Sequence, residues 1–201
     1  FPENVSVAFG LDFPFVLAKV RASGIHATDI LGATAPKIRE ALGDSLAAEG
    51  DETLPRKVAR LLIERKKTLS LAESCTGGLL ASMLTDIPGS SAFLERGGVT
   101  YANSAKRQWL GVTDEILDGE GAVSEACALA MARGIRRTSK TDLGLAITGI
   151  AGPTGGSLEK PVGTVFIALA DADGEEVRRF LFHGERSRIR LLSATSALDL
   201  L

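Results

Sequence analysis

Three groups of polar and small residues in this sequence could carry out chemistry. They are Ser74-Cys75-Thr76-Gly77-Gly78, then Tyr101 with Asn103 and Lys106, and finally Thr148-Gly149 with the glycine-rich loop that follows. Each group comes at or just after the end of a short apolar run that we interpret as a β-strand. Ligand crevices of open α/β sheets lie beyond the carboxyl ends of the strands, so parallel strands would bring the three groups together.

Ser74 and Lys106 could form a nucleophile and base pair. A neutral lysine amine can take the hydroxyl proton as the serine oxygen attacks an amide carbon. This role requires the pKa of Lys106 to fall from about 10.4 to roughly 7–8, through burial or a neighbouring cation. Tyr101 could share or relay the proton. The alternative is that Lys106 is a solvated helix lysine or a plain phosphate contact, and the pattern leaves both open.

The first group also opens a helix, where small residues and free N–H groups suit a phosphate or an oxyanion. A tight strand-to-helix turn that needs glycine only for its geometry is an equal alternative. The loop does not match the Walker pattern of phosphate-binding ATPases. Cys75 could be a thiolate nucleophile with a lowered pKa, or simply a small packed residue.

Other ligand-binding side chains are sparse. His26 and His183 lie in no motif, which disfavours a Ser-His-Asp triad. No group of His, Cys, Asp and Glu has the spacing of metal ligands, so we predict neither a metal nor an organic cofactor. Lys160 ends the glycine-rich loop and could hold a phosphate. Arg186, Arg188 and Arg190 alternate near the start of the last helix and are typical of a solvated face.

The elements that position these groups alternate between strands and helices from about residue 68 onward. We predict strands at 68–72, 97–102 and 143–148, and an antiparallel hairpin formed by 163–170 and 176–183. Helices are predicted after Asp51, after Gly78, from Asn103, from Ser124 and from about Glu185. The fold class is therefore α/β: a three-layer domain with a largely parallel sheet plus an antiparallel hairpin.

Residues 1–50 are predicted to form a separate, small α+β unit with two strands and a helix that starts at Pro36. Such a unit is too short to bury much surface alone. The domain of interest then covers residues 51–201. Because Phe1-Pro2 is not a natural start, we interpret the chain as a piece of a longer protein.

Composition excludes several classes of protein. The 201 residues are 45% hydrophobic and 24% charged, with a net charge of −2 and 5% aromatic residues. These values are typical of a globular chain and disfavour direct nucleic-acid binding, which needs a basic field or stacking aromatics. Two cysteines cannot form a disulfide framework, and neither a signal sequence nor a membrane-spanning run is visible. We therefore expect a cytoplasmic protein without membrane contact.

Six ordered blocks resemble one known family. They are Leu71-Ala72-Glu73-Ser74-Cys75-Thr76-Gly77-Gly78, Pro88-Gly89-Ser90-Ser91, Gly98-Val99-Thr100-Tyr101 with Asn103 and Lys106, Ala122-Val123-Ser124-Glu125, Thr148-Gly149-Ile150-Ala151-Gly152-Pro153 and Lys160-Pro161-Val162-Gly163-Thr164-Val165. Together they are similar to the CinA C-terminal domain family, which contains the bacterial nicotinamide-nucleotide amidases. Residues 1–50 resemble, more loosely, the end of the middle domain of longer CinA proteins.

The resemblance implies hydrolysis of the carboxamide of nicotinamide mononucleotide to nicotinic acid mononucleotide and ammonia. It implies Ser74 as nucleophile, Lys106 as base and Tyr101 beside them, with no metal or cofactor. We expect the substrate-binding residues to be Thr76, Gly77, Gly78, Asn103, Thr148, Gly149, Gly152 and Lys160. Of these, we assign the N–H groups of residues 76–78 to the oxyanion and residues 152–160 to the phosphate.

Two other expectations accompany this reading. The alternative function is a non-catalytic nucleotide-binding module of a competence or damage-inducible protein, which would bind a mononucleotide without turnover. We also expect a homo-oligomer, since an incomplete N-terminal unit often borrows strands from a second subunit.

Overall fold

The computed structural model describes residues 4–201, so Phe1 and Pro2, on which the fragment interpretation depends, lie outside the described residues. The chain divides into two compact units, Phe1–Asp51 and Glu52–Leu201. None of the helices within residues 4–201 combines the length and apolar character that crossing a bilayer requires.

The first unit has the predicted order of two strands and a helix. Strands β1 (Val5–Asp12) and β2 (Phe15–Ala22) form an antiparallel hairpin, followed by α1 (Ala27–Leu42) and the short 3-10 helix η1 (Gly43–Ser45). The predicted helix start at Pro36 is wrong, because Pro36 lies inside α1. A proline inside a helix removes one hydrogen bond without necessarily ending the helix. His26 makes no side-chain cap, so the sequence offers no signal of the true start.

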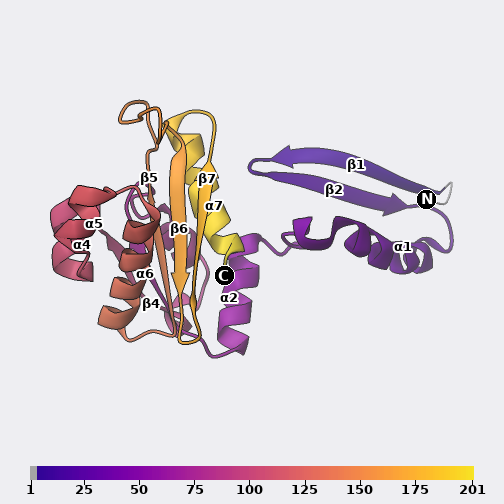
Figure 1. Ribbon diagram of the computed structural model, residues 1–201. Coiled ribbons are helices and arrows are strands. Elements are labelled where there is room, and N and C mark those ends of the chain that lie inside the picture. Colours follow the sequence, from indigo (N-terminus) through magenta and orange to yellow (C-terminus); the bar gives the residue numbers. More distant parts are fainter. Residues whose placement is uncertain (1–3) are drawn as a thin grey trace. The chain divides into compact units, whose positions relative to one another are not determined.

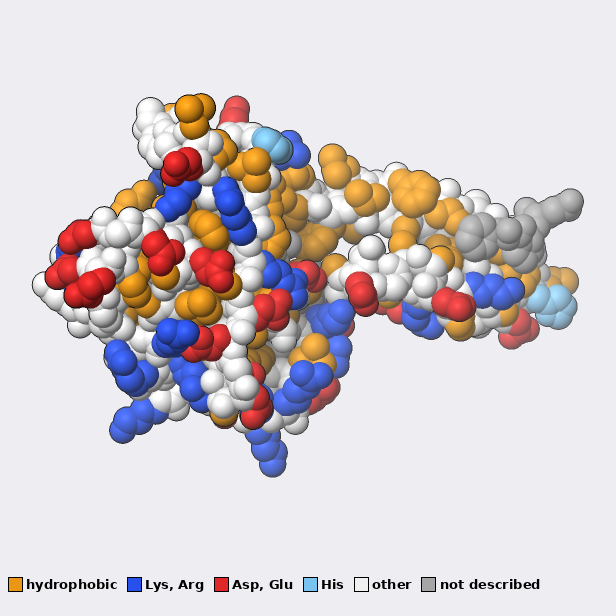
Figure 2. Space-filling view, in the orientation of Figure 1, with side chains coloured by type: hydrophobic (Ala, Val, Ile, Leu, Met, Phe, Trp, Pro, Cys, Tyr) orange, Lys and Arg blue, Asp and Glu red, His pale blue; other side chains and the backbone are white. Residues whose placement is uncertain are grey.

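The first unit has almost no interior of its own. Thr34 is the one buried residue among residues 4–51. The side chains of Phe9, Leu11 and Val16 are 69–76% exposed, and apolar side chains extend along the hairpin in Figure 2. A two-stranded hairpin with one helix therefore leaves most of its apolar surface uncovered.

The second unit is built on a five-stranded sheet in the order β4-β3-β5-β6-β7. The strands are β3 (Leu69–Glu73), β4 (Leu94–Val99), β5 (Leu143–Gly149), β6 (Thr164–Ala170) and β7 (Glu175–Leu181). Strands β4, β3 and β5 run parallel, whereas β6 is antiparallel to both β5 and β7. Four of the five strands therefore point the same way, which confirms the largely parallel sheet with its hairpin.

Helices cover both faces of this sheet, which confirms the three layers (Figure 1). One face carries α6 (Glu125–Ser139), against which α4 (Asn103–Leu110) and α5 (Asp114–Gly119) pack. The other face carries α2 (Leu54–Glu64), α3 (Leu79–Thr85) and α7 (Arg186–Asp199). The short 3-10 helix η2 (Ser90–Ala92) precedes β4.

Small side chains allow α6 to lie close to the sheet. Ala72, Ala146 and Ala168, from the three central strands, are fully buried in one cluster with residues of α6 such as Met131. A Cβ atom on Gly144 would lie only 2.4 Å from a backbone oxygen of α6. This close packing holds the central strands rigidly beneath the polar groups at their carboxyl ends.

Three predicted boundaries are corrected by one to three residues. The second predicted strand covers Leu94–Val99 rather than residues 97–102, so Thr100 and Tyr101 lie beyond it. Helix α2 has Thr53 rather than Asp51 at its N-cap, and Asn103 is the first residue of α4 rather than its cap. Ser124 is the N-cap predicted for α6, and its Oγ accepts a hydrogen bond from the N–H of Cys127.

Candidate active site

Ser74 and Lys106 meet at the carboxyl edge of the parallel strands. Ser74 directly follows β3, and Lys106 lies in the first turn of α4, 32 positions later. Nζ of Lys106 is 3.0 Å from Oγ of Ser74. Only 8% of Ser74 and 1% of Lys106 are exposed to solvent. A hydroxyl and an amine are therefore in hydrogen-bond contact inside the protein.

The surroundings of Lys106 favour an uncharged amine. Its Nζ donates to the carbonyl oxygens of Thr100 at 2.8 Å and Tyr101 at 3.0 Å, and Lys106 forms no ion pair with any described residue. Burial lowers the pKa of Lys106, and the smaller effects of the Cys127 and Cys75 thiols act in the opposite direction. A neutral amine has two hydrogens, which match the two carbonyls, and one lone pair, which then faces Ser74.

The loop that carries Ser74 is held at both ends. The N–H of Ser74 donates to the carbonyl of Ile147 in β5, and the N–H of Gly77 closes a turn onto the carbonyl of Ser74. Gly77 and Gly78 have φ angles of +62° and +93°, which side chains other than glycine rarely adopt. Glycine at these two positions is therefore required by the backbone geometry itself.

Glu73 occupies the helix start that we expected to hold substrate. Its buried carboxylate accepts hydrogen bonds from the N–H groups of Gly78, Leu80 and Ala81 at 2.8–3.2 Å. With the Gly77 N–H also used, two of the three predicted oxyanion donors already have partners. In the sequence, Glu73 stands out only as a member of the block Leu71–Gly78, and no role is predicted for it.

Cys75 and Thr76 lie between Ser74 and these glycines. Their N–H groups donate to no backbone carbonyl among the described residues, and both lie near the Cys75 sulfur, where they favour the thiolate. Burial outweighs this effect and raises the pKa of the Cys75 thiol to about 11. Cys75 is therefore a protonated thiol at neutral pH. The Thr76 hydroxyl is buried and has no hydrogen-bond partner among residues 4–201.

Tyr101 and Asn103 contribute differently from each other. The Tyr101 side chain is 58% exposed, and its hydroxyl accepts a hydrogen bond from Nη2 of Arg186 at 3.0 Å. It is the carbonyl of Tyr101, not the phenol, that contacts Lys106. Asn103 is exposed and makes no capping hydrogen bond at the start of α4.

The third predicted group begins with Thr148 and Gly149, the last two residues of β5, and continues along the loop between β5 and β6. The Thr148 hydroxyl donates to the carbonyl of Ala122 at 2.6 Å. A Cβ atom on Gly149 would lie 2.8 Å from the carbonyl oxygen of Thr164, so this glycine allows close strand packing. The carbonyl of Gly152, whose φ is +80°, accepts a hydrogen bond from Arg186, whereas Lys160 Nζ donates to the carbonyl of Glu120 at 2.6 Å.

The predicted solvated face at the start of α7 is exposed at Arg186 and Arg188, but two of its arginines also make long-range hydrogen bonds that the sequence did not indicate. Arg186 donates to the carbonyl of Gly152 at 2.8 Å as well as to the hydroxyl of Tyr101. Arg190, one helical turn later, donates twice to the carbonyl of Thr76, at 2.6 and 3.1 Å. Neither guanidinium forms an ion pair with a described residue. Two uncompensated positive charges therefore lie beside the predicted site.

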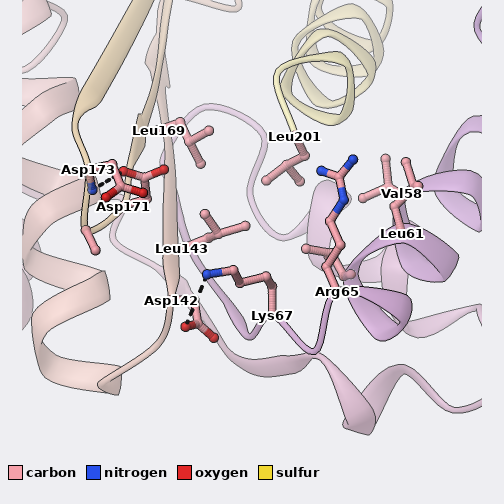
Figure 3. A pocket seen from close by; sticks show the side chains of 12 residues that line it. Val58, Leu61, Arg65, Lys67, Asp142, Leu143, Leu169, Asp171, Asp173 and Leu201 are labelled. Carbon is pink, nitrogen blue, oxygen red and sulfur yellow. Dashed lines mark hydrogen bonds and ion pairs between the residues drawn. The ribbon is translucent and has the colours of Figure 1, made fainter.

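A separate cavity lies at the other end of the parallel strands, near the residues where β3 and β5 begin. It has a volume of about 260 Å³ and is lined by apolar residues such as Leu61 and Leu143, with Arg65 and Asp171 among its charged residues (Figure 3). None of the predicted site residues lines it. Across residues 4–201, no group of three or more His, Cys, Asp or Glu side chains is arranged to hold a metal ion.

Comparisons with known proteins agree with this architecture. The family described as CinA C-terminal domain matches residues 51–201. A CinA-like protein of Syntrophotalea carbinolica is 56% identical over 198 residues, which is 98% of this chain and 48% of the relative. A CinA-like protein of Geobacter sulfurreducens is 52% identical over 98% of this chain and 48% of its own length. The chain thus spans about half the length of these curated relatives.

Solved structures show the same fold. A competence/damage-inducible protein of Agrobacterium tumefaciens is 43% identical, with a TM-score of 0.70 over 76% of this chain and 96% of that one. A CinA superfamily protein of Escherichia coli is 32% identical, with a TM-score of 0.70 over 80% of this chain and 98% of that one. The fold of the second unit is therefore shared with these proteins.

Proposed function

This chain belongs to the CinA family through its C-terminal domain, and from that premise we propose that it hydrolyses the carboxamide of nicotinamide mononucleotide. The products would be nicotinic acid mononucleotide and ammonia. The substrate is the one that the family resemblance implies. The single observation that carries the proposal is the buried contact between Ser74 Oγ and Lys106 Nζ at 3.0 Å.

The first half of the reaction forms an ester on the serine. The Ser74 oxygen attacks the carboxamide carbon while its proton passes to the lone pair of Lys106. The resulting ammonium group returns that proton to the amide nitrogen, the C–N bond breaks and ammonia leaves. In the second half, water attacks the ester carbon with Lys106 again accepting a proton, and the serine is restored.

The carbonyls of Thr100 and Tyr101 support this cycle without reacting. While Lys106 is neutral, they take its two hydrogens and aim its lone pair at Ser74. When Lys106 becomes an ammonium group, the third hydrogen lies on the Ser74 side, where the proton is needed next. The geometry thus suits both protonation states, which a general base that later acts as an acid requires.

The oxyanion of the tetrahedral intermediate needs donors that are not already used. Because the Gly77 and Gly78 N–H groups have oxygen acceptors, we move this role to the N–H groups of Cys75 and Thr76, which lie near only the weakly accepting Cys75 sulfur among the described residues. Both belong to the same loop as the nucleophile, so they would move with the Ser74 backbone rather than independently of it.

The phosphate of the substrate would bind near α7. Among the described residues, Arg186 and Arg190 donate to neutral acceptors alone, so a phosphate dianion would be a stronger partner for either guanidinium. Lys160 is tied to the Glu120 carbonyl, which favours the arginines over the lysine for this role. The Gly152 side of the glycine-rich loop remains part of the proposed phosphate site through Arg186.

Incubation with nicotinamide mononucleotide tests the proposal directly. We expect equal amounts of ammonia and nicotinic acid mononucleotide, and we expect Ser74→Ala to lower turnover by about a hundredfold or more. Ser82→Ala, at an exposed position of α3, is the matched control and should keep full activity. Tight binding of the nucleotide without any turnover would instead support the non-catalytic module and reject the amidase.

A further inference from the structure

Glu73 is a buried acid immediately before the proposed nucleophile. It is the last residue of β3 and only 1% of it is exposed. One carboxylate oxygen accepts hydrogen bonds from the N–H groups of Gly78 at 3.0 Å and Leu80 at 3.2 Å. The other accepts from Ala81 at 2.8 Å. A buried carboxylate is stable only with such partners, and the first N–H groups of a helix supply them.

The backbone around Glu73 is fixed independently by the sheet. Its carbonyl accepts the N–H of Thr100, and the next N–H, that of Ser74, donates to Ile147 of β5. The strand therefore anchors the entry to the nucleophile loop, residues 74–77. The Glu73 carboxylate anchors the exit from the same loop at Gly78 and the first turn of α3. The loop is thus closed around one side chain.

We propose that Glu73 is a positioning residue that fixes the direction of Ser74 Oγ toward Lys106 by tying both ends of the nucleophile loop together. Among the described residues, its carboxylate bonds to neither Lys106 nor Ser74, so it acts through the loop. The inference rests on the proposed role of Ser74 as the nucleophile. A displacement of about 1 Å in such a contact can cost roughly a hundredfold in rate.

The glutamine variant distinguishes the hydrogen bonds that Glu73 accepts from the space that its side chain fills. Glu73→Gln keeps the size of the side chain but replaces one acceptor oxygen by an NH2 group. Whichever way the amide turns, that NH2 group faces a backbone N–H, either of Ala81 or of Gly78 and Leu80. At least one of the three hydrogen bonds that tie the first turn of α3 to Glu73 must therefore break, although nothing at the Lys106 side is altered.

The experiment measures the reactivity of Ser74 without the nucleotide. Diisopropyl fluorophosphate phosphorylates an activated serine: the Ser74 oxygen bonds to phosphorus, fluoride leaves and Lys106 takes the proton. We expect Glu73→Gln to slow this labelling about a hundredfold, with the acid limb of its pH profile unchanged. With nicotinamide mononucleotide, kcat should fall by a similar factor while KM stays close to that of the wild type.

Ser70→Ala is the matched control for lost stability. Ser70 is a fully buried polar residue of the same strand, and its hydroxyl bonds to that of Thr141 at 2.7 Å, away from the loop. We expect it to lower the midpoint of urea unfolding and to leave the labelling rate of folded protein unchanged. If Glu73→Gln does not fold, Glu73→Asp, which keeps the charge but is one methylene shorter, provides the same comparison.

The outcomes distinguish this inference from the proposed function. Labelling of folded Glu73→Gln at the wild-type rate would overturn the positioning role. A pH profile of labelling whose acid limb is shifted while its maximum rate is unchanged would overturn it as well. Glu73→Gln could label slowly although the wild type releases no ammonia from nicotinamide mononucleotide. That result would support the positioning role of Glu73 and reject only the proposed substrate. If diisopropyl fluorophosphate does not label Ser74 of the wild-type protein, both the positioning role of Glu73 and the proposed function are overturned.

Discussion

The backbone of Gly134 in α6 lies directly against the carbonyl of Leu110 at the end of α4. A Cβ atom on Gly134 would be 2.1 Å from that oxygen, far inside any normal contact. Because α4 carries Lys106, this approach of two helix backbones sets how deeply the amine reaches toward Ser74. The position of the proposed base therefore depends on a glycine 28 residues further along the chain.

Gly134→Ala is expected to destabilise the second unit and to weaken the Ser74–Lys106 contact. The obstructing atom belongs to the backbone and cannot rotate away, so overpacking should lower the free energy of unfolding by about 1–3 kcal/mol. Urea unfolding and ammonia release measure the two effects. Gly119→Ala, in α5 with open space around its Cβ, is the control and should preserve both. Equal stability of the two variants would contradict the packing argument.

The pH dependence of turnover should follow the neutral form of Lys106. Burial lowers the pKa of this amine, and only the uncharged form can accept the Ser74 proton. We therefore expect kcat/KM to rise with pH up to the lowered pKa and then to level off, below the pH at which a solvated lysine titrates. A rate that rises only near pH 10.4, where a free lysine loses its proton, would argue against a buried base.

Substitution of Lys106 tests the same point by chemistry. Lys106→Arg keeps a positive charge but cannot lose its proton, so it should be as inactive as Lys106→Ala, with turnover lower by about a hundredfold or more. Lys140→Arg, on a left-handed residue at the end of α6, is the control and should be fully active. Substantial activity of Lys106→Arg would show that charge, rather than proton transfer, is the contribution of Lys106.

Much of the sheet could be predicted from the sequence because its strands are short apolar runs that end at polar or small residues. The contact between Ser74 and Lys106 followed from one rule, since both residues lie beyond neighbouring parallel strands. The rule does not predict the distance between Ser74 Oγ and Lys106 Nζ. That distance depends on the close approach of α4 and α6, which the sequence pattern does not indicate.

Long-range contacts of charged residues could not be predicted. Arg186 and Arg190 are one turn apart at the charged start of α7, which is also the pattern of a solvated face. Only the fold shows that this face meets Tyr101 and the carbonyl of Thr76, up to 114 positions away. Glu73 illustrates the same limit, because an acid at the end of an apolar strand gives no sign of which backbone N–H groups will donate hydrogen bonds to its carboxylate.

Cys75 is expected to be dispensable for catalysis, although it is adjacent to Ser74. Burial raises the pKa of its thiol to about 11, so almost none is thiolate at neutral pH. Cys75→Ala should keep turnover within about tenfold of the wild type, with any loss arising from the small cavity left behind. Loss of activity as severe as that of Ser74→Ala would instead make the thiol the nucleophile, and alkylation of Cys75 by iodoacetamide would then abolish ammonia release.

Arg186 should recognise the phosphate end of the substrate. Within residues 4–201, its guanidinium donates hydrogen bonds only to the Gly152 carbonyl and the Tyr101 hydroxyl, both neutral. Replacing it by glutamine removes a charge-assisted contact of about 1.5–3 kcal/mol, so kcat/KM for nicotinamide mononucleotide should fall about ten- to hundredfold. Nicotinamide riboside, which has no phosphate, should show almost no difference between the wild type and Arg186→Gln.

The control for this charge is Arg178→Gln on β7, where the arginine is exposed and paired with Glu176 at 2.7 Å. It removes the same charge from the domain but lies outside the proposed site, so both substrates should be hydrolysed at wild-type rates. An equal loss for the riboside and the mononucleotide in Arg186→Gln would mean that this arginine acts by holding Tyr101 and the Gly152 loop in place. The phosphate would then have to bind elsewhere, with Arg190 as the next guanidinium to replace.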